Sequence, residues 1–323
     1  MIPLLLFLLL ISSIASIVSA SMSTFSRSQV LGWWWTNKAV LNVIDSSSSM
    51  EALPQDTPAM SASDLASELR KSMLRLKSEF ITGNGEKVDY AAMRSSDAFK
   101  EYVKLSSLLQ TVDLASFPNE SSKKGFLINI YNCLCIHALC EGLLSSFPGG
   151  SLSRLKLYAS SSYNIGGVPY SLNDIENGLL RNNKKSAAPF SSVPFGDDDP
   201  RKQYCLNCDE RIHFALNCGA KSCPPIAVYS VDDESKLNNQ LDLACKGFLS
   251  QPSNVDLDTE GKIGLSMIFK WYQDDFCEDG GSNEQLIGWI ARNAPGERKS
   301  QIESVAATSP QVTWLEYDWG LNQ

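Results

Sequence analysis

The sequence is poor in positive charge and in histidine. Its 323 residues include 28 Lys and Arg against 36 Asp and Glu, which gives a formal net charge of −8, and no run of Lys and Arg forms a basic stripe. Because such a field repels phosphate backbones, the composition argues against a nucleic-acid partner. There are only two histidines and no internal repeat. With 43% hydrophobic and 20% charged residues, the chain is typical of a globular protein.

One long apolar run is present, from Leu4 to Val18, and Val18-Ser19-Ala20 offers the small residues that signal peptidase accepts. We therefore predict that residues 1–20 are a signal peptide and that the protein enters the secretory pathway. Two alternatives stay open: an uncleaved membrane anchor formed by residues 4–18, which would be the only membrane contact, and a start site assigned too early. No Lys or Arg precedes the run, and about fifteen residues are short for a spanning helix.

Composition divides the rest of the chain in two. Residues 21–60 are rich in Ser, Thr and Pro without a sustained period, which predicts a tether, and residues 61–323 are predicted to form one globular domain. Helical periods run from Ser63 to Phe80 and from Ser95 to Gln110, and the most apolar segment, residues 122–145, is expected to be the central helix. Further helices are expected near residues 171–181, 237–248, 266–276 and 286–290. Hairpins are expected at residues 163–170 and 255–265, with a last strand at 312–319. Helices outnumber strands, and the strands are local, so the pattern favours a helix-rich α+β fold with a long central helix and short β-hairpins.

Polar residues interrupt the central helix. Asn129 and Asn132 share a face, and because a buried amide without partners costs about 1–3 kcal/mol, both must be hydrogen-bonded. They either face a cleft as amide donors or hold backbone carbonyls of a covering loop, and we favour the second interpretation. His137 lies off that face and is expected to be a core histidine. Cys133, Cys135 and Cys140 share no common face and are expected to pack as small apolar groups.

The densest group of reactive side chains is HFALNCGAKSCPP, from His213 to Pro225. Four interpretations stay open for His213, Cys218 and Cys223: a thiolate nucleophile activated by the histidine, a zinc site completed by Cys205 and Cys208, a disulfide, or plain packing. The interval between Cys208 and Cys218 is short for a zinc ribbon, and Cys205-Leu-Asn-Cys208 lacks the flanking elements of a thioredoxin fold. We assign no cofactor and no metal. The polar loop 182–210 is long, and such loops often cover a site.

Five ordered segments resemble the uncharacterised family called domain of unknown function 547. They are FLINIYNCLCIHAL (126–139), YNIGGVPYSLNDIENGLLR (163–181), RIHFALNCGAKSCPP (211–225), LSMIFKWYQDDF (265–276) and YDWGLN (317–322), and the similarity spans roughly Ser61 to Asn322. The family name implies a fold and no reaction. Other members carry a glutaredoxin-like or leucine-zipper segment before this domain, and neither is visible here. The resemblance singles out Asn129, Tyr131, Asn132, Glu176, Arg181, His213, Cys218, Cys223, Pro224, Lys270, Trp271, Tyr272 and Phe276. It departs at Asn177, where members usually have histidine.

These observations lead to one hypothesis and two alternatives. In the first, a polar cleft between the central helix and residues 213–225 holds a thiol-dependent hydrolase or transferase site. Cys218 or Cys223 would be its nucleophile, His213 its base, and Asn129 or Asn132 its oxyanion donors; Glu176 is a further candidate. The second is a non-catalytic binding or scaffold module, and the third is a redox or zinc-bearing module. Whether the protein is an enzyme, and what its partners are, stay open at this point.

Overall fold

The chain folds around one buried helix, α6. A computed structural model describes residues 39–43, 60–82, 87–144, 151–188, 191–225, 227–257, 261–277 and 281–321. Its first half contains β1 (Ala39–Val40), α3 (Ala62–Phe80), β2 (Ile81–Thr82), β3 (Lys87–Val88), α4 (Tyr90–Ser95), α5 (Asp97–Ser107), η2 (Leu108–Thr111), η3 (Leu114–Ser116), α6 (Glu120–Cys140), α7 (Ser151–Ser160), β4 (Ser161–Ile165) and β5 (Val168–Ser171). Its second half contains η4 (Asp174–Leu180), η5 (Pro200–Tyr204), η6 (Glu210–Phe214), α8 (Glu234–Ser250), β6 (Val255–Asp256), β7 (Lys262–Leu265), α9 (Met267–Trp271), α10 (Gln273–Phe276), α11 (Asn283–Asn293), α12 (Gly296–Ala306) and β8 (Gln311–Trp314).

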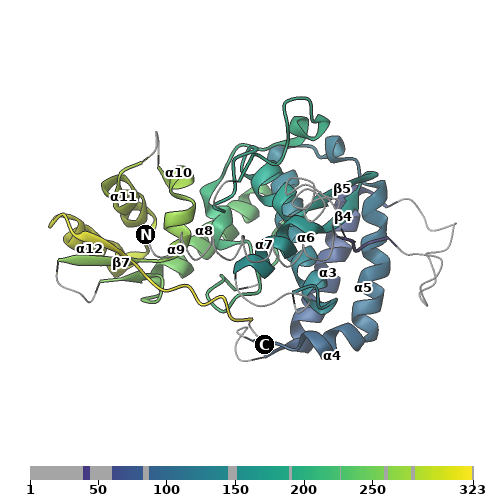
Figure 1. Ribbon diagram of the computed structural model, residues 1–323, viewed down its shortest axis with the longest axis horizontal. Helices are drawn as coiled ribbons and strands as arrows, with labels where there is room; N and C mark the ends of the chain where they lie inside the picture. Colours follow the sequence, from purple (N-terminus) through teal and green to yellow (C-terminus); the bar gives the residue numbers. More distant parts are fainter. Residues whose placement is uncertain are drawn as a thin grey trace, which may run out of the picture.

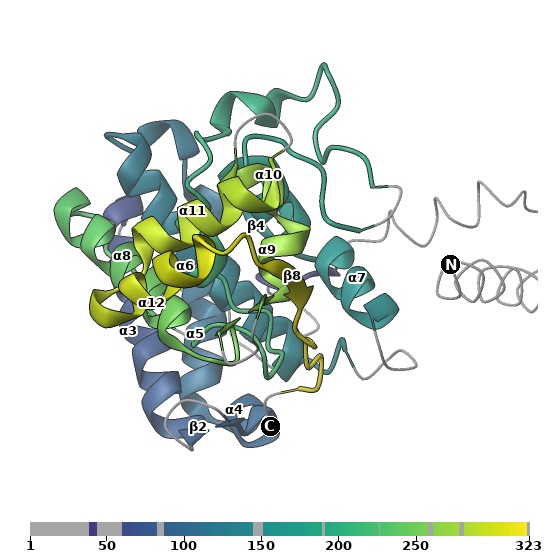
Figure 2. The same cartoon turned by 90° about the vertical axis from the view of Figure 1, so that its left-hand side faces the viewer.

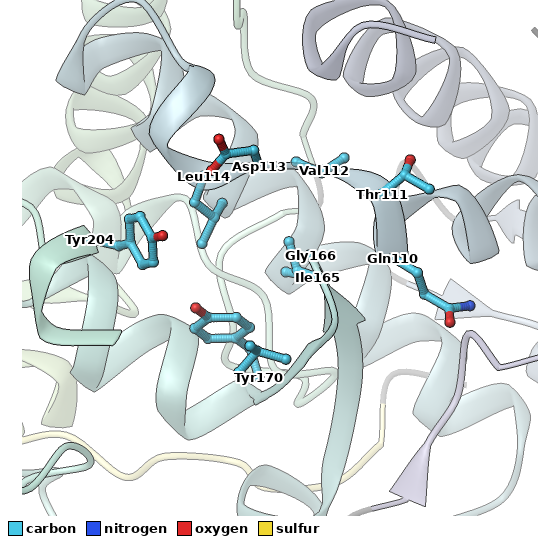
Figure 3. Close-up of a pocket in the computed structure, with 10 residues that line it drawn as sticks. Gln110, Thr111, Val112, Asp113, Leu114, Ile165, Gly166, Tyr170 and Tyr204 are labelled. Carbon is cyan, nitrogen blue, oxygen red and sulfur yellow. The ribbon is translucent and has the colours of Figure 1, made fainter. Parts of the chain in front are cut away.

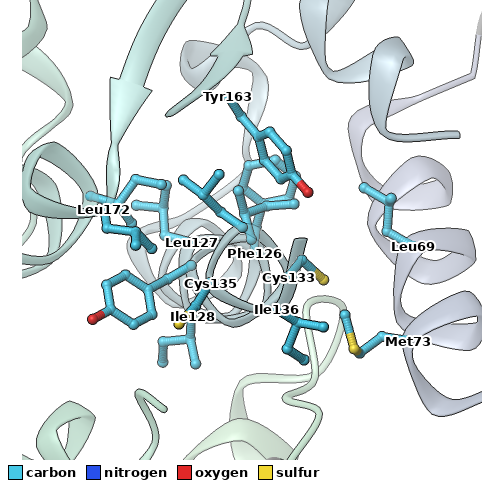
Figure 4. Close-up of a cluster of buried hydrophobic side chains, with 14 of the residues drawn as sticks. Leu69, Met73, Phe126, Leu127, Ile128, Cys133, Cys135, Ile136, Tyr163 and Leu172 are labelled. Atoms are coloured by element: carbon cyan, nitrogen blue, oxygen red, sulfur yellow. The ribbon is translucent and has the colours of Figure 1, made fainter. Parts of the chain in front are cut away.

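Helix α6 is the predicted central helix. The Asn119 side chain caps it by accepting the Ser122 N–H at 2.7 Å, and every residue from Gly125 to Cys140 is buried. Figure 4 looks along this helix and shows side chains of α3, β4 and neighbouring segments packed around it. A Cβ on Gly125 would lie 2.1 Å from the carbonyl oxygen of Ser230, so glycine lets the segment before α8 approach the helix backbone.

Two hydrophobic cores make up the interior. The α6 core joins α3, α5, α6 and the β4–β5 hairpin, and the Phe269 core joins α8, β7, α9, α10 and α11. In Figure 1 these groups occupy the right and the left of the molecule, with α8 between them; Figure 2 views the left-hand group in front of α6. Residues of η6 belong to both cores, because Ile212 packs in the first and Phe214 in the second. His213, which lies between these two residues, is therefore placed where the α6 core and the Phe269 core meet.

The predicted α+β class, rich in helix with a long central helix and short hairpins, is confirmed. The hairpins β4–β5 and β6–β7 are antiparallel as expected. Two parallel pairings were not expected: β1 with β4, and β8 with β7. Among the described residues, three α-helices (α4, α7 and α12) and the 3-10 helices η3, η5 and η6 were also not expected. The helix predicted near residues 171–181 exists as η4, wound as a π-helix, and Ser171 and Asp174 cap its start by exchanging hydrogen bonds between side chain and backbone N–H.

Part of the predicted tether belongs to the domain. Residues 39–43 lie within the expected tether 21–60, yet β1 pairs with β4, and the fully buried Asn42 donates to the carbonyl oxygens of Ser106 at 3.0 Å and Asn164 at 2.9 Å. The predicted signal peptide or anchor, residues 1–20, lies outside the described residues. Over the part of the chain that the structure describes, no helix has both the length and the apolarity needed to cross a membrane.

Candidate functional site

The two asparagines of α6 bind backbone. Asn129 donates to the carbonyl oxygen of Tyr229 at 2.7 Å and accepts the N–H of the same residue at 2.9 Å. Asn132 donates to the carbonyl oxygen of Ala215 at 3.0 Å and accepts the Asn217 N–H at 2.8 Å. Both amides thus hold covering segments onto the helix, which is the interpretation that the sequence favoured. At Asn132 the central helix and the His213–Pro225 segment touch directly, where we had expected a cleft.

His213 is oriented by a carboxylate. Its side chain is buried, and Nε2 lies 2.8 Å from Oδ2 of Asp275 on α10. Burial lowers the pKa of His213, although the hydrogen bond to Asp275 acts in the opposite direction. The imidazole is therefore neutral at pH 7, and because an ionised carboxylate only accepts, Nε2 carries the hydrogen.

Asp275 also forms ion pairs with two cationic side chains. Arg181 donates from Nε to Oδ2 at 2.5 Å and from Nη2 to Oδ1 at 3.2 Å, and Lys184 lies 2.7 Å from Oδ1. Burial alone would raise the pKa of Asp275, but the hydrogen bonds from His213 and Arg181 outweigh it and hold that pKa well below its usual range. The carboxylate is ionised, and its side chain has no exposed surface.

A second buried carboxylate, Glu176, accepts from two phenols. Tyr131 on α6 donates to Oε2 at 2.8 Å, and Tyr272 donates to Oε1 at 2.6 Å. The Tyr272 ring in turn stacks on His213, with ring centroids 3.9 Å apart, and the guanidinium of Arg181 lies 4.7 Å from the same ring centroid. The structure therefore brings Glu176 and His213, both predicted site residues, into one buried polar cluster.

Asn177 belongs to that cluster. Its Oδ1 accepts from Nη1 of Arg181 at 2.5 Å, and its amide donates to Oδ1 of Asn173 at 3.0 Å. The residue that departs from the family pattern thus orients the arginine that pairs with Asp275.

Cys218 and Cys223 are bonded to each other in a disulfide. Of the four interpretations of these cysteines, this is the one that the structure shows, and neither sulfur is a free thiol in this state. Both residues are half-buried. Gly219 follows Cys218 with φ of +74°, a left-handed conformation that the short loop between the cysteines uses.

Polar groups surround the two sulfurs. The N–H of Cys218 points at Sγ of Cys223 at 3.1 Å, and the hydroxyl of Tyr317 lies 3.2 Å from Sγ of Cys223 and 3.5 Å from Sγ of Cys218. Burial raises the pKa of Tyr317, so its phenol is protonated and able to donate. The Tyr317 ring packs against Trp271 and Trp319, with centroids 4.9 and 4.6 Å away.

A buried guanidinium completes this environment. Arg154 on α7 donates to the carbonyl oxygen of Cys218 at 2.8 Å and to that of Trp319 at 2.6 Å. The side chain is 3% exposed and forms no ion pair with any residue that the structure describes. A buried positive charge without a paired carboxylate favours negative charge nearby, and Arg154 binds the backbone of Cys218, a disulfide cysteine that becomes a thiol or thiolate on reduction.

The seven other cysteines are poor thiolates. Burial raises the pKa of Cys133, Cys135, Cys140, Cys208 and Cys245 to about 12, and it also raises the pKa of Cys205 and Cys277. The three cysteines of α6 are buried, as predicted. His137 is likewise a core residue, with Nδ1 2.9 Å from the Tyr163 hydroxyl.

The four-cysteine zinc site is not assembled, because Cys218 and Cys223 are joined to each other. Within the described ranges, no group of three or more His, Cys, Asp or Glu side chains has the arrangement of a metal site. Two cavities in these ranges lie elsewhere and are lined by neither His213 nor Glu176.

Three residues of this region had no predicted role: Asp275, Arg154 and Tyr317. Asp275 and Tyr317 lie inside segments that carry the family resemblance, so the motifs contained a signal for both. Arg154 lies in α7, which the sequence did not predict, and its contacts are to backbone carbonyls far along the chain.

Comparison with known proteins yields one finding. Residues 115–249 match the family described as "Protein of unknown function, DUF547", which includes α6, the Glu176 segment and the cysteine loop. No curated protein and no solved structure matches the chain. The family description gives no reaction, so any activity has to be argued from the residues themselves. The resemblance is confirmed over residues 115–249, which match the DUF547 family model and contain three of the five motifs.

Proposed function

We propose that Cys218 and Cys223 form a dithiol–disulfide redox site that exchanges electrons with thiols of other molecules. One observation carries the proposal: Sγ of Cys223 lies 3.1 Å from the Cys218 N–H and 3.2 Å from the Tyr317 hydroxyl. A thiolate needs such donors far more than a disulfide sulfur does, so the environment is suited to the reduced form.

The chemistry is a two-step exchange. A substrate thiolate attacks Sγ of Cys218, a new S–S bond forms, and the electron pair of the broken Cys218–Cys223 bond leaves on Cys223 as thiolate. The second substrate thiol, once deprotonated, attacks the substrate sulfur of this mixed disulfide and releases Cys218 as thiolate. The substrate dithiol is thereby oxidised by two electrons, the protein disulfide is reduced, and the two protons released by the substrate go to solvent or to the new cysteine thiols.

The roles of the two cysteines follow from their surroundings. A disulfide is cleaved more readily when the leaving thiolate is stabilised. The backbone N–H donor reaches Cys223, and the Tyr317 hydroxyl lies closer to Cys223 than to Cys218. Cys223 is therefore the leaving group and Cys218 the sulfur that bonds to substrate. The positive charge of Arg154, which binds the Cys218 carbonyl, adds to the stabilisation of either thiolate.

The hydrolase hypothesis finds less support in this geometry. It requires a free thiol, whereas Cys218 and Cys223 are bonded to each other. It also requires free amide donors, whereas the side-chain N–H groups of Asn129 and Asn132 donate to backbone carbonyls. The scaffold alternative predicts satisfied asparagines, which is observed, but it offers no reason for a phenol hydroxyl and a backbone N–H directed at the sulfur of Cys223.

The test measures both the potential and the order of attack. The protein is equilibrated with glutathione redox buffers, and the oxidised fraction is counted by mass spectrometry after thiol alkylation. We expect a reduction potential above about −300 mV, because structural disulfides typically lie below that value. In parallel, the reduced C218S and C223S variants are treated with cystamine, with C277S as a control for an unrelated thiol.

We expect C223S to accumulate the mixed disulfide at Cys218, and C218S to form much less at Cys223. A potential below about −300 mV, together with exchange no faster than for a simple peptide disulfide, would show a purely structural bridge and leave the scaffold alternative. Preferential labelling of Cys223 would reverse the assigned roles.

We further propose that the protein enters the secretory pathway, where disulfides persist. The apolar run 4–18 supports this, and so does the sequon Asn119-Glu120-Ser121, because Asn119 is exposed while its Oδ1 caps α6. A glycan on the amide nitrogen leaves that cap intact. Expression in a eukaryotic secretory host should give a mass shift that a glycosidase removes and that the N119Q variant lacks; retention of the whole product in the cytosol would contradict the proposal.

A further inference from the structure

Away from the disulfide, the surface is hollowed beside the β4–β5 hairpin. Two adjoining cavities, of about 280 and about 660 Å³, share Val168, Tyr170 and Tyr204 in their walls. The first is closed by residues 110–114 and the second by residues 196–203 of the long polar loop. That loop was expected to cover a site, and volumes of this size are typical of small-molecule sites.

Tyr170 is the least expected group in these walls. Its side chain is only 2% exposed, yet none of the described residues forms a hydrogen bond with its hydroxyl. The oxygen is not sealed in the protein either, since it is not among the fully buried atoms that lack a partner. In Figure 3 the Tyr170 side chain directs its hydroxyl toward the space between Tyr204 and Leu114. A buried phenol that aims a free hydroxyl into a cavity is an available hydrogen-bonding group for a ligand.

The surrounding charge selects the kind of ligand. Asp113 lines the smaller cavity, and Asp197 and Asp198 line the larger one, all with exposed side chains. The lining cation, Arg201, is engaged by Asp199 at 2.7 Å and by Asp174 at 3.2 Å. Lys202 lies 3.6 Å from Asp197, and Lys123 lies 5.6 Å from the centroid of the Tyr204 ring. Asp113 and Asp198 remain as rim carboxylates without an ion pair among the described residues, and their charges disfavour a carboxylate or phosphate ligand.

We infer that this hollow, the Tyr170 cavity, binds a small organic cation, an ammonium or guanidinium group carried on a flat or extended apolar body. The apolar body would lie against Val168, Leu114 and the ring of Tyr204. The cationic N–H groups would donate to the phenol oxygens or to the carboxylates at the rim. Burial raises the pKa of Tyr170 to about 12, so the phenol keeps its proton at neutral pH and its oxygen can still accept.

The test compares two probes of the same shape and opposite charge. Tyramine and 3-(4-hydroxyphenyl)propionate are titrated separately into the full chain and followed by ligand-observed NMR and calorimetry. We expect tyramine to bind and the acid not to bind at the same millimolar concentration. Tyr170→Phe, which keeps the ring, should weaken tyramine about threefold to tenfold through loss of one hydrogen bond.

Two substitutions at exposed residues test the binding of tyramine even if the Tyr170→Phe variant does not fold. Asp198→Asn removes a rim charge and should weaken tyramine, whereas Glu316→Gln removes the same charge from an exposed position after β8 and should leave binding unchanged. The inference is overturned if tyramine does not bind, if the acid binds equally well, or if D198N and E316Q change affinity by the same factor. It is independent of the redox proposal, since none of these variants touches the disulfide.

Discussion

Replacing Tyr317 by phenylalanine tests the redox proposal at one atom. The change removes the hydroxyl that lies 3.2 Å from Sγ of Cys223, while the ring keeps its place between Trp271 and Trp319. Because the hydroxyl donates more strongly to a thiolate than to a disulfide sulfur, its loss should destabilise the reduced form. The disulfide should then be harder to reduce.

The size of the effect follows from the strength of the bond. A hydrogen bond to a charged group contributes about 1.5–3 kcal/mol. For a two-electron couple about 30 mV corresponds to about 1.4 kcal/mol, so the potential should become more negative by about 30–60 mV. The measurement is made above the ordinary thiol pKa of about 8.5, where the thiolate form dominates.

The control for this variant is Tyr229→Phe. Tyr229 is a buried tyrosine whose hydrogen bonds to Asn129 of α6 use its backbone N–H and carbonyl, so the control removes a hydroxyl without touching the sulfurs. The reasoning fails if Tyr317→Phe leaves the potential unchanged or makes it less negative. It also fails if Tyr229→Phe shifts the potential equally, because the effect would then come from a general loosening of the fold.

Three further predictions concern the buried polar groups, each measured by urea unfolding. Asn132→Ala leaves two buried backbone groups unpaired at about 1–3 kcal/mol each, so the unfolding free energy should fall by about 2–6 kcal/mol, and a fall below the lower figure would contradict the bonding described. Asp275→Asn strands a buried guanidinium and should cost about 3–5 kcal/mol at neutral pH. Because the folded state lowers the Asp275 pKa, that difference should shrink as the pH falls below about 4, and a constant difference would argue against the ion pair. Burial lowers the pKa of His137 to about 3, so at mildly acidic pH this imidazole is protonated in the unfolded chain and neutral in the folded one. Between about pH 7 and about pH 5, the unfolding free energy of the unchanged protein should therefore fall by about 2 kcal/mol more than that of the His137→Gln variant. Parallel pH profiles of the two proteins would refute the assignment.

Periodic patterns in the sequence predicted helices, because the spacing of apolar residues within one segment decides which face of a helix is buried. The spacing of Leu65, Leu69, Met73 and Leu76 predicted α3, and the apolar run after Asn119 predicted α6. The rule that buried amides need partners also predicted that Asn129 and Asn132 would be hydrogen-bonded. It could not name the partners, because the residue that Asn129 binds, Tyr229, is one hundred positions away.

The candidate site depends on such distant pairings. Arg181 and Asp275 are 94 residues apart, and so are Cys223 and Tyr317. No periodicity links residues at that separation, and the parallel pairing of β8 with β7 crosses the whole of α9 to α12 before it closes. The sequence therefore indicated which side chains were unusual, whereas the tertiary fold decided which of them meet.

Asn177 separates two roles for the histidine that the family resemblance led us to expect at this position. A general base must exchange a proton, which an amide cannot do. A positioning group needs only to accept a hydrogen bond, and Asn177 does so from Arg181 while its own amide donates to Asn173. A neutral imidazole nitrogen could accept the same bond. Since Arg181 holds Asp275, and Asp275 holds His213, the substitution preserves the order of this buried cluster. The proposed exchange at Cys218 and Cys223 requires no base at position 177, so the change from histidine leaves that chemistry available to this chain.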